Sequence, residues 1–500
     1  WLERLIEAEE EPKRKADKAN LIALMYRDEL DDPVQAARYL GQVLDYDVSR
    51  LEAFQLIDEM LTKQKDWQGL ESAYARMVER VEAAGKALEK GPALLFTLHR
   101  NLGEIYRSRL REPDKAAAAY EAALRERPDD TVVREILLNL YEATPERWQD
   151  AVRQHRYLVA AEPDRFENYH RLFKLYVRME QPDAAWCVAG LLCGLDQATP
   201  DEEVFYHQHV DALAAEPSRD LDDEAWDRYL VSEGEDHALG QIFATVYSAL
   251  SKSLGGVRTL KDFGYKKKDK FDLEQKTLLA SALNGVGRVL GMPVPDAYVG
   301  QGMGMELLPT VPPVLKVGRD MTTGHSQKEI AFHAAKQMTY AHPARVMATL
   351  YQHEQLDQFF MAAFSLVVPD FQIPVKPELS ESDIQQLAQT VGEIRAELDR
   401  RLTPQQRSEL ALHIQTFQAQ NALPNIGAWH RQVELTANHA ALLVCGDIEL
   451  AERLLAREVV GNSKLGRGEK LKDLVHYVLG ERFAQARCDL GLTVHVEEAS

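Results

Sequence analysis

Three histidines in the second half of the chain are the residues best suited to bind a metal ion. His333, His342 and His439 each offer a ring nitrogen suited to Zn²⁺, and Glu434 offers a carboxylate oxygen. Glu434 and His439 are five residues apart, however, and this spacing converges poorly on one face of a straight helix. We therefore expect these histidines to be ordinary core or surface residues, and we predict no bound metal or other cofactor.

Cysteine and serine chemistry has no better support. The four cysteines are scattered and form no Cys-x-x-Cys pair: Cys187, Cys193, Cys445 and Cys488. They indicate reduced core thiols, or at most an incidental disulfide. Cys445 lies within an apolar run, so we expect it to be a packing thiol. No serine or paired-carboxylate arrangement has a stronger claim to catalysis.

A glycine-rich segment invites comparison with a phosphate-binding loop. Gly300, Gly302 and Gly304 lie between two short apolar runs, 297–299 and 314–317, that are bounded by Gly and Pro and predict strands. No helix start and no Lys-Ser/Thr pair follows the glycines, and a phosphate loop needs both. We therefore predict that the glycines form a hairpin turn between the two strands.

Helices are predicted on either side of these strands. They are expected at 273–290, 380–401, from 403 onward, at 448–457 and at 469–490, with an edge strand at 492–496. Ser380 and Asp383 form a capping pattern at the start of the second of these helices. Trp429 is expected to pack against the core.

Two further segments carry a resemblance to a known family. They are Glu329–Tyr340 and, some ninety residues later, Glu434–Leu443. Together with the predicted strand at 297–299, they resemble HtpX-like zinc metallopeptidases over about residues 271–460. In that family a strand leads into a helix with an HExxH motif, and a later helix carries ExxAD.

The resemblance implies that the zinc site has been lost. The HExxH position is occupied by Lys336-Gln337-Met338-Thr339-Tyr340, and only the third ligand, Glu434, is kept, with Asn438 in place of the aspartate. An ammonium group has no lone pair for a metal, and glutamine is not a base. Our hypothesis is that Lys336 and Glu434 instead face each other as an ion pair.

The first half of the chain shows an internal repeat. Tyr106, Tyr141 and Tyr176 are spaced 35 residues apart, as are Pro128 and Pro163. Between these markers, apolar residues recur at helical spacing, and alanines allow close helix contact. We predict about five to six antiparallel helix pairs over residues 1–253.

One unit resembles the tetratricopeptide (TPR) repeat. Its matching residues are Leu102-Gly103, Tyr106, Ala116, Tyr120, Ala123 and Pro128. The next units fit less well, with His155 and Gly190 where an aromatic residue is expected.

A TPR-like solenoid presents a concave groove formed by the first helix of each pair. The residues predicted to line it are Arg100, Glu104, Arg107, Glu135, Asn139, His170 and Lys174. The array as a whole favours capture of a protein or peptide. For each residue taken singly, a solvated helix face is the competing interpretation.

Residues 254–270 form a basic stretch with Lys261, Lys266, Lys267, Lys268 and Lys270. Docking of an acidic partner is one interpretation, and a solvated linker is the one we favour. Only Phe263 and Tyr265 accompany the lysines, so a nucleic-acid site is not supported.

Composition narrows the classes of partner. Among 500 residues there are 79 acidic and 59 basic ones, for a net charge of −20, which disfavours nucleic acid and anionic membranes. No apolar run approaches the roughly 20 residues of a membrane-spanning helix. Because the sequence begins at Trp1 rather than Met, we expect an upstream region; further repeats or a signal peptide stay open.

The prediction is a mainly α protein: TPR-like repeats at 1–253, a linker at 254–270, and a mostly helical α+β metallopeptidase-like domain with a small sheet at 271–500. We expect a cytoplasmic, non-catalytic scaffold that binds a protein or peptide in the TPR groove. The alternatives are an active metal-dependent peptidase with relocated ligands and a regulator of a related peptidase. Partner identity and oligomeric state stay open.

Overall fold

The structure is a computed structural model that describes residues 2–85, 88–210, 220–251, 259–368, 371–373, 380–419, 425–458, 461 and 463–494. The chain is mainly α-helical with one small sheet, as predicted. Its backbone contacts divide into two units, Trp1–Ala161 and Glu162–Ser500. This division falls earlier in the chain than the predicted end of the repeats at residue 253.

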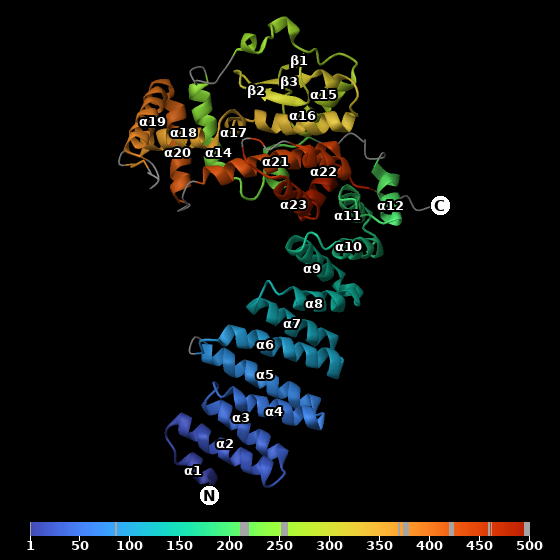
Figure 1. The fold of residues 1–500 in the computed structure, drawn as a ribbon, viewed down its shortest axis with the longest axis vertical. Helices are drawn as coiled ribbons and strands as arrows, with labels where there is room; N and C mark the ends of the chain where they lie inside the picture. The colour runs from blue at the N-terminus through green and yellow to red at the C-terminus, as the bar shows by residue number, and fades with distance from the viewer. Residues whose placement is uncertain are drawn as a thin grey trace. The chain divides into compact units, whose positions relative to one another are not determined.

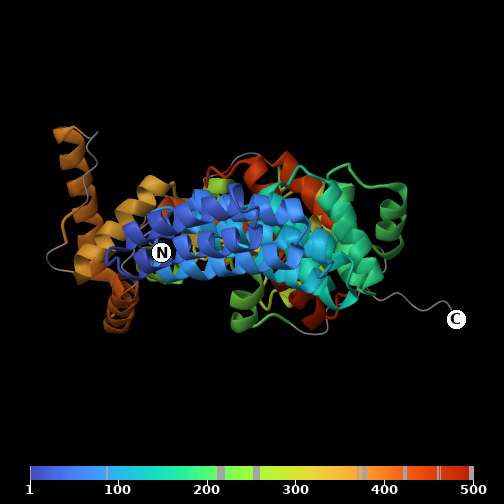
Figure 2. The ribbon, with the colours of Figure 1, turned by 90° about the horizontal axis from the view of Figure 1, so that it is seen from below.

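The first unit is a succession of paired helices (Figure 1). Its elements are α1 (Leu2–Glu7), α2 (Pro12–Asp28), α3 (Pro33–Tyr46), α4 (Leu51–Gln64), α5 (Trp67–Ala84), α6 (Gly91–Glu104) with its π-helical extension η2 (Ile105–Leu110), α7 (Pro113–Glu126), α8 (Thr131–Glu142), the short η3 (Pro145–Arg147) and α9 (Trp148–Ala161). Helix α2 packs on α3, α4 on α5, α6 on α7 and α8 on α9. Figures 1 and 2 show these helices side by side, layer after layer. The predicted pairing is therefore confirmed in this unit.

Sequence features at the helix starts explain why the pairs form. Asp32, Asp66 and Asp130 each accept a hydrogen bond from a backbone N–H in the first turn of the following helix. Pro33 and Pro113 occupy first helical positions, where their fixed φ suits the helix and the missing N–H is not needed. These signals restart a helix after each short turn, so successive helices fold back on one another.

Close packing of α6 on α7 depends on Gly103. A Cβ added there would lie 2.9 Å from the Tyr120 ring, which is fully buried.

We expect Gly103→Ala to lower the free energy of unfolding by about 1–3 kcal/mol, because an overpacked site must shift its neighbours. Urea unfolding measures this change. Gly392→Ala is the control: a Cβ there meets nothing within 4 Å, so stability should stay the same or rise by about 0.5–1 kcal/mol. Equal effects in the two variants would contradict this account of the α6–α7 contact.

The second unit combines helices with a three-stranded sheet (Figure 1). Before the sheet come α10 (Glu167–Arg178), α11 (Pro182–Gly194), α12 (Pro200–Val210), α13 (Asp223–Ala225), η4 (Trp226–Leu230), α14 (His237–Leu250), η5 (Leu260–Phe263), η6 (Lys267–Asp269) and α15 (Leu278–Val289). After it come η7 (Arg319–Thr322), α16 (Gln327–Ala341), α17 (Val346–Leu350), α18 (His353–Val367), α19 (Glu381–Arg401), α20 (Pro404–Ala419), α21 (Ile426–Cys445), α22 (Ile448–Arg457), α23 (Arg467–Val478) and α24 (Glu481–Asp489).

The sheet contains both predicted strands and one that was missed. Its strands are β1 (Ala297–Gly300), β2 (Met305–Leu308) and β3 (Val314–Gly318), in the order β1-β3-β2. β1 pairs with β3 in parallel and β2 pairs with β3 antiparallel. The predicted hairpin between β1 and β3 is therefore wrong. β1 and β3 are parallel, and a tight hairpin turn cannot join parallel strands. The glycine segment leads instead from β1 to the missed strand β2.

The described part of the predicted linker packs on this sheet. Phe263 and Tyr265 lie against a small core formed by Tyr298, Leu308 and Val314. Lys270 forms an isolated antiparallel bridge with Tyr298. The five lysines named above are exposed. Residues 259–270 thus cover one edge of the sheet, while Leu254–Arg258 lie outside the described residues.

Helix boundaries agree with prediction in several places. Helix α22 has the predicted bounds, α20 begins at Pro404, one residue after the predicted start, and Ser380 and Asp383 form the predicted capping box of α19. Helix α15 begins at Leu278 rather than at residue 273, after the N-cap Thr277. The helix predicted at 469–490 is divided into α23 and α24, with Gly480 in an extended conformation between them. Residues 492–494 form no strand, and 495–496 lie outside the described residues.

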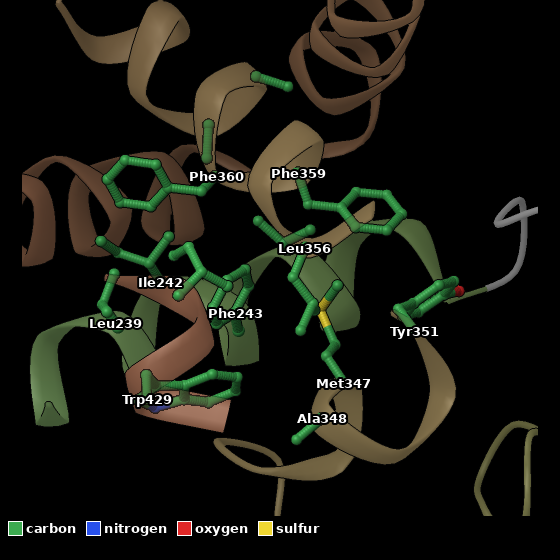
Figure 3. Packing of buried hydrophobic residues seen from close by; sticks show 14 of the residues in the cluster. Leu239, Ile242, Phe243, Met347, Ala348, Tyr351, Leu356, Phe359, Phe360 and Trp429 are labelled. Carbon is green, nitrogen blue, oxygen red and sulfur yellow. The ribbon is translucent and has the colours of Figure 1, made fainter. Parts of the chain in front are cut away.

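A large apolar core holds one end of α21 in place. It gathers side chains from α14, α17, α18, α20 and α21 (Figure 3). Trp429, near the start of α21, is 1% exposed and packs on Phe243 with ring centroids 4.8 Å apart. The prediction that Trp429 packs against the core is confirmed. This anchoring positions the middle of α21, which carries Glu434.

Candidate functional site

Helices α16 and α21 pack against each other and bring Lys336 and Glu434 together. Lys336 Nζ lies 3.6 Å from Glu434 Oε1, and each residue is 6% exposed. The predicted contact between these two side chains is therefore confirmed. Both charges lie away from water, where an unpaired charge is strongly unfavourable.

Two further charged residues, which the sequence prediction missed, complete a cluster. Glu458 directly follows α22, and Lys470 is in α23 with an exposure of 2%. Glu458 Oε2 lies 2.6 Å from Lys336 Nζ and 2.8 Å from Lys470 Nζ. Lys470 Nζ also lies 2.5 Å from Glu434 Oε1. We call Lys336, Glu434, Glu458 and Lys470 the charge cluster; its two ammonium and two carboxylate groups balance in charge.

Lys470 could have been found from its position in the helix pattern. Lys470, Leu474 and Val478 are buried and follow one another at intervals of four residues in α23. A lysine on the apolar face of an amphipathic helix calls for a buried acidic partner. Glu458 carries no comparable pattern in the sequence, since only the tertiary fold brings it to α16.

The pKa shifts of Glu458 and Lys470 favour the charged forms of these two groups. Burial alone would raise the pKa of Glu458, but Lys336 and Lys470 outweigh this effect and hold it below its ordinary value. Burial would lower the pKa of Lys470, but its contacts with Glu434 and Glu458 raise it. The pKa of Tyr340, one turn beyond Lys336, is raised by burial and then by both glutamates, so its hydroxyl stays protonated.

These opposite shifts predict a pH window for the stability that the cluster contributes. Glu458 has a folded-state pKa below its ordinary 4.5, so its contribution is present above pH 4.5 and is lost as the pH falls through the folded value. Lys470 has a raised pKa, so its contribution is present below pH 10.5 and is lost above it. In urea unfolding, Glu458→Gln should be clearly less stable than the wild type at about pH 7 and much closer to it at about pH 3. An equal difference at the two pH values would contradict this assignment.

Gln337 and Asn438, two other residues that the resemblance assigns to the lost zinc site, differ in their hydrogen bonding. Gln337 Oε1 accepts a hydrogen bond from the backbone N–H of Leu307 in β2, at 3.0 Å. Asn438 is 2% exposed, and neither polar atom of its side chain has a hydrogen-bond partner among the described residues. Gln337 therefore ties α16 to an edge strand, whereas the amide of Asn438 is buried without compensation.

The three histidines do not form a site together. His439 Nδ1 lies 2.9 Å from the Leu230 carbonyl oxygen, and its Nε2 lies 2.8 Å from Asp473 Oδ2. Burial, followed by the charge of Arg345, lowers the pKa of His342 to about 4. Burial also lowers the pKa of His333. Within the described ranges, no three His, Cys, Asp or Glu side chains are arranged to hold a metal ion.

Zinc, which the family resemblance implies, does not fit the residues present. The carboxylate of Glu434 is in contact with two ammonium groups and also accepts a hydrogen bond from Ser463 Oγ. Two cations beside the carboxylate of Glu434, which the resemblance would make a ligand, would repel a divalent ion. The cluster has the chemistry of a structural ion network, in which each charged group is paired.

The residues predicted to line the TPR groove fall in both units. In the first unit, Glu104 forms an ion pair with Arg107 at 2.9 Å and accepts a hydrogen bond from Tyr120 at 3.1 Å. The exposed Arg100 lies over the Phe96 ring. Glu135 and Asn139 lie on α8, half-buried and exposed respectively. In the second unit, His170 Nδ1 lies 2.9 Å from Glu202, and Lys174 is exposed on α10.

No protein-family model matches this sequence, and no curated protein is significantly similar to it. Among the described helices, none has both the length and the apolar character that crossing a membrane requires. The fold therefore defines a class in architectural terms. The chain is a mainly helical protein with many paired helices in its N-terminal half and a small mixed sheet in its C-terminal half.

Proposed function

We propose that this protein is a non-catalytic interaction scaffold, whose paired helices bind a protein or peptide and whose second unit is an inactive peptidase-like domain. The observation that carries the proposal is the charge cluster. It places Lys336 and Lys470 on the carboxylate of Glu434, which is the one metal ligand that the family resemblance retains. A site filled by mutually paired side chains stabilises the packing of α16, α21 and α23, and it offers no group to activate water.

The helix pairs supply surface for binding. Repeated helix pairs expose an extended face whose polar side chains contact a bound chain. Arg100 and Arg107 are exposed basic side chains on α6 and its extension η2. An acidic or amphipathic peptide is the partner that such side chains suit best.

The experiment is selection of peptides from a random display library on the full chain, followed by affinity measurement. Selected peptides should bind Arg100→Ala/Arg107→Ala at least about tenfold more weakly than the wild type, as expected for lost charged contacts. The control is Arg395→Ala, which removes an exposed arginine from α19 in the second unit. If the peptides bound Arg100→Ala/Arg107→Ala as tightly as the Arg395→Ala control, the proposed binding surface on the helix pairs would be wrong. Zinc-dependent cleavage of the peptides would contradict the non-catalytic assignment.

A further inference from the structure

A second polar site lies in the second unit, apart from the charge cluster. It is a cavity of about 450 Å³ between the C-terminal end of α11, one face of α22 and the start of α23. Its charged lining comprises Asp196, Glu449, Glu452, Arg453, Arg457 and Arg467. The volume falls within the range of roughly 300–1,000 Å³ that is usual for small-molecule sites. Three acidic and three basic groups thus face a space large enough for a small ligand.

Glu452 is the most unusual residue of this cavity. It is 6% exposed, and no hydrogen bond or ion pair joins its carboxylate to another described residue. Burial raises the pKa of Glu452, and the nearby positive charges of Arg467 and Arg453 oppose that rise. Gly194 lets α22 approach α11 closely, since a Cβ there would lie 3.0 Å from Glu452 Cβ. The stem of Glu452 thus packs against α11, and the residue also lines the cavity. A buried carboxylate without a partner is costly, so a cationic group that reached it would be bound favourably.

Two of the arginines in the cavity are able to bind an anionic group. Arg453 contacts Glu449 at 3.3 Å, so Glu449 is partly neutralised. Arg457 and Arg467, in contrast, form no ion pair in the described part of the chain, although the charge of Arg467 acts on Glu452. Guanidinium groups bind carboxylates with two parallel hydrogen bonds. An anionic group on a ligand would find two such donors here.

We infer that this cavity binds a small zwitterion with the chemistry of a free α-amino acid. The ammonium group would contact Glu452, and the carboxylate would contact Arg457 and Arg467. Leu195, Ala456 and Leu471 also line the cavity and provide an apolar surface for a side chain. This inference does not depend on the proposed scaffold function, because none of these residues belongs to the helix pairs of the first unit or to the charge cluster.

The test is binding of the standard α-amino acids, one at a time, to the full chain, by thermal shift and then by calorimetry. At least one should bind the wild type. Its affinity should fall about tenfold or more when the ligand lacks the ammonium group or when its carboxylate is converted to an amide. Glu452→Gln and Arg457→Ala should each weaken binding of the intact amino acid to a similar degree.

Arg395→Ala, on an exposed position of α19, serves as the control and should leave the affinity unchanged. Glu452→Gln keeps the shape of the buried side chain, and Arg457→Ala changes an exposed one, so circular dichroism should show a wild-type fold for at least the second variant. The inference is overturned if no amino acid binds the wild type. It is equally overturned if Arg457→Ala binds the amino acid as tightly as the wild type does and the wild type binds the ligand without the ammonium group as tightly as the intact amino acid.

Discussion

Lys470→Met is expected to lower the free energy of unfolding by about 3–5 kcal/mol, the range found when one member of a buried ion pair is removed. Methionine keeps most of the length of the side chain but not its charge. Glu434 and Glu458 would then share only Lys336, which lies 3.6 Å and 2.6 Å from them, and one negative charge would be left buried without a partner. Urea unfolding followed by far-UV circular dichroism at neutral pH measures the change.

Lys464→Met, only six positions earlier, is the matched control. The side chain of Lys464 is 65% exposed, and its ion-pair contact with Glu354 is 3.8 Å long. Exposed pairs of this kind contribute little, so a change below about 0.5 kcal/mol is expected. The double variant Lys470→Met/Glu458→Gln removes one charge of each sign and should recover part of the lost stability. A Lys470→Met protein as stable as the Lys464→Met control would show that the charge cluster is not a paired network.

Arg487→Met is expected to have an effect of similar size, about 3–5 kcal/mol. Arg487 is 1% exposed and donates to both carboxylate oxygens of Asp183, at 2.7 Å and 3.1 Å. It also donates to the Leu492 carbonyl at 2.7 Å and lies over the Trp186 ring. The substitution leaves Asp183, whose side chain is 18% exposed, beside α24 without its cation.

The Arg487 contacts also hold the segment after α24, because the Val494 N–H donates to Asp183 Oδ1 at 2.8 Å. Hydrogen exchange at Val494 should therefore become faster in Arg487→Met, in addition to the loss in urea stability. Arg431→Met, an exposed arginine on α21, should change neither quantity. Unchanged exchange at Val494 together with wild-type stability in Arg487→Met would contradict this role.

Most of the confirmed predictions rest on patterns between residues close together in the sequence. The 35-residue spacing of Tyr106 and Tyr141 predicted a repeat of about one helix pair. The pairs α6–α7 and α8–α9 have this spacing. Ser380 with Asp383 predicted a capping box because that motif is satisfied within one helical turn. The contact between Lys336 and Glu434 was inferred from a family resemblance, and two packed helices provide it.

The misses are features that depend on long-range packing. β2 is only four residues long, and its place at the edge of β3 is decided by pairing rather than by a turn motif. Glu458 and Lys336 are 122 residues apart in the sequence, so no local pattern could predict that they form an ion pair. The unpartnered carboxylate of Glu452 likewise depends on Gly194, which lets two helices approach. Such sites follow from the fold and not from spacing along the chain.

Zinc content tests the central claim most directly. The purified full chain is dialysed against excess zinc and then against metal-free buffer, and bound metal is measured by mass spectrometry for the wild type and for Glu434→Gln. If Lys336 and Lys470 have taken the place of a divalent ion beside Glu434, both proteins will retain far less than one zinc per chain. One tightly held zinc per wild-type chain that disappears in Glu434→Gln would contradict the account.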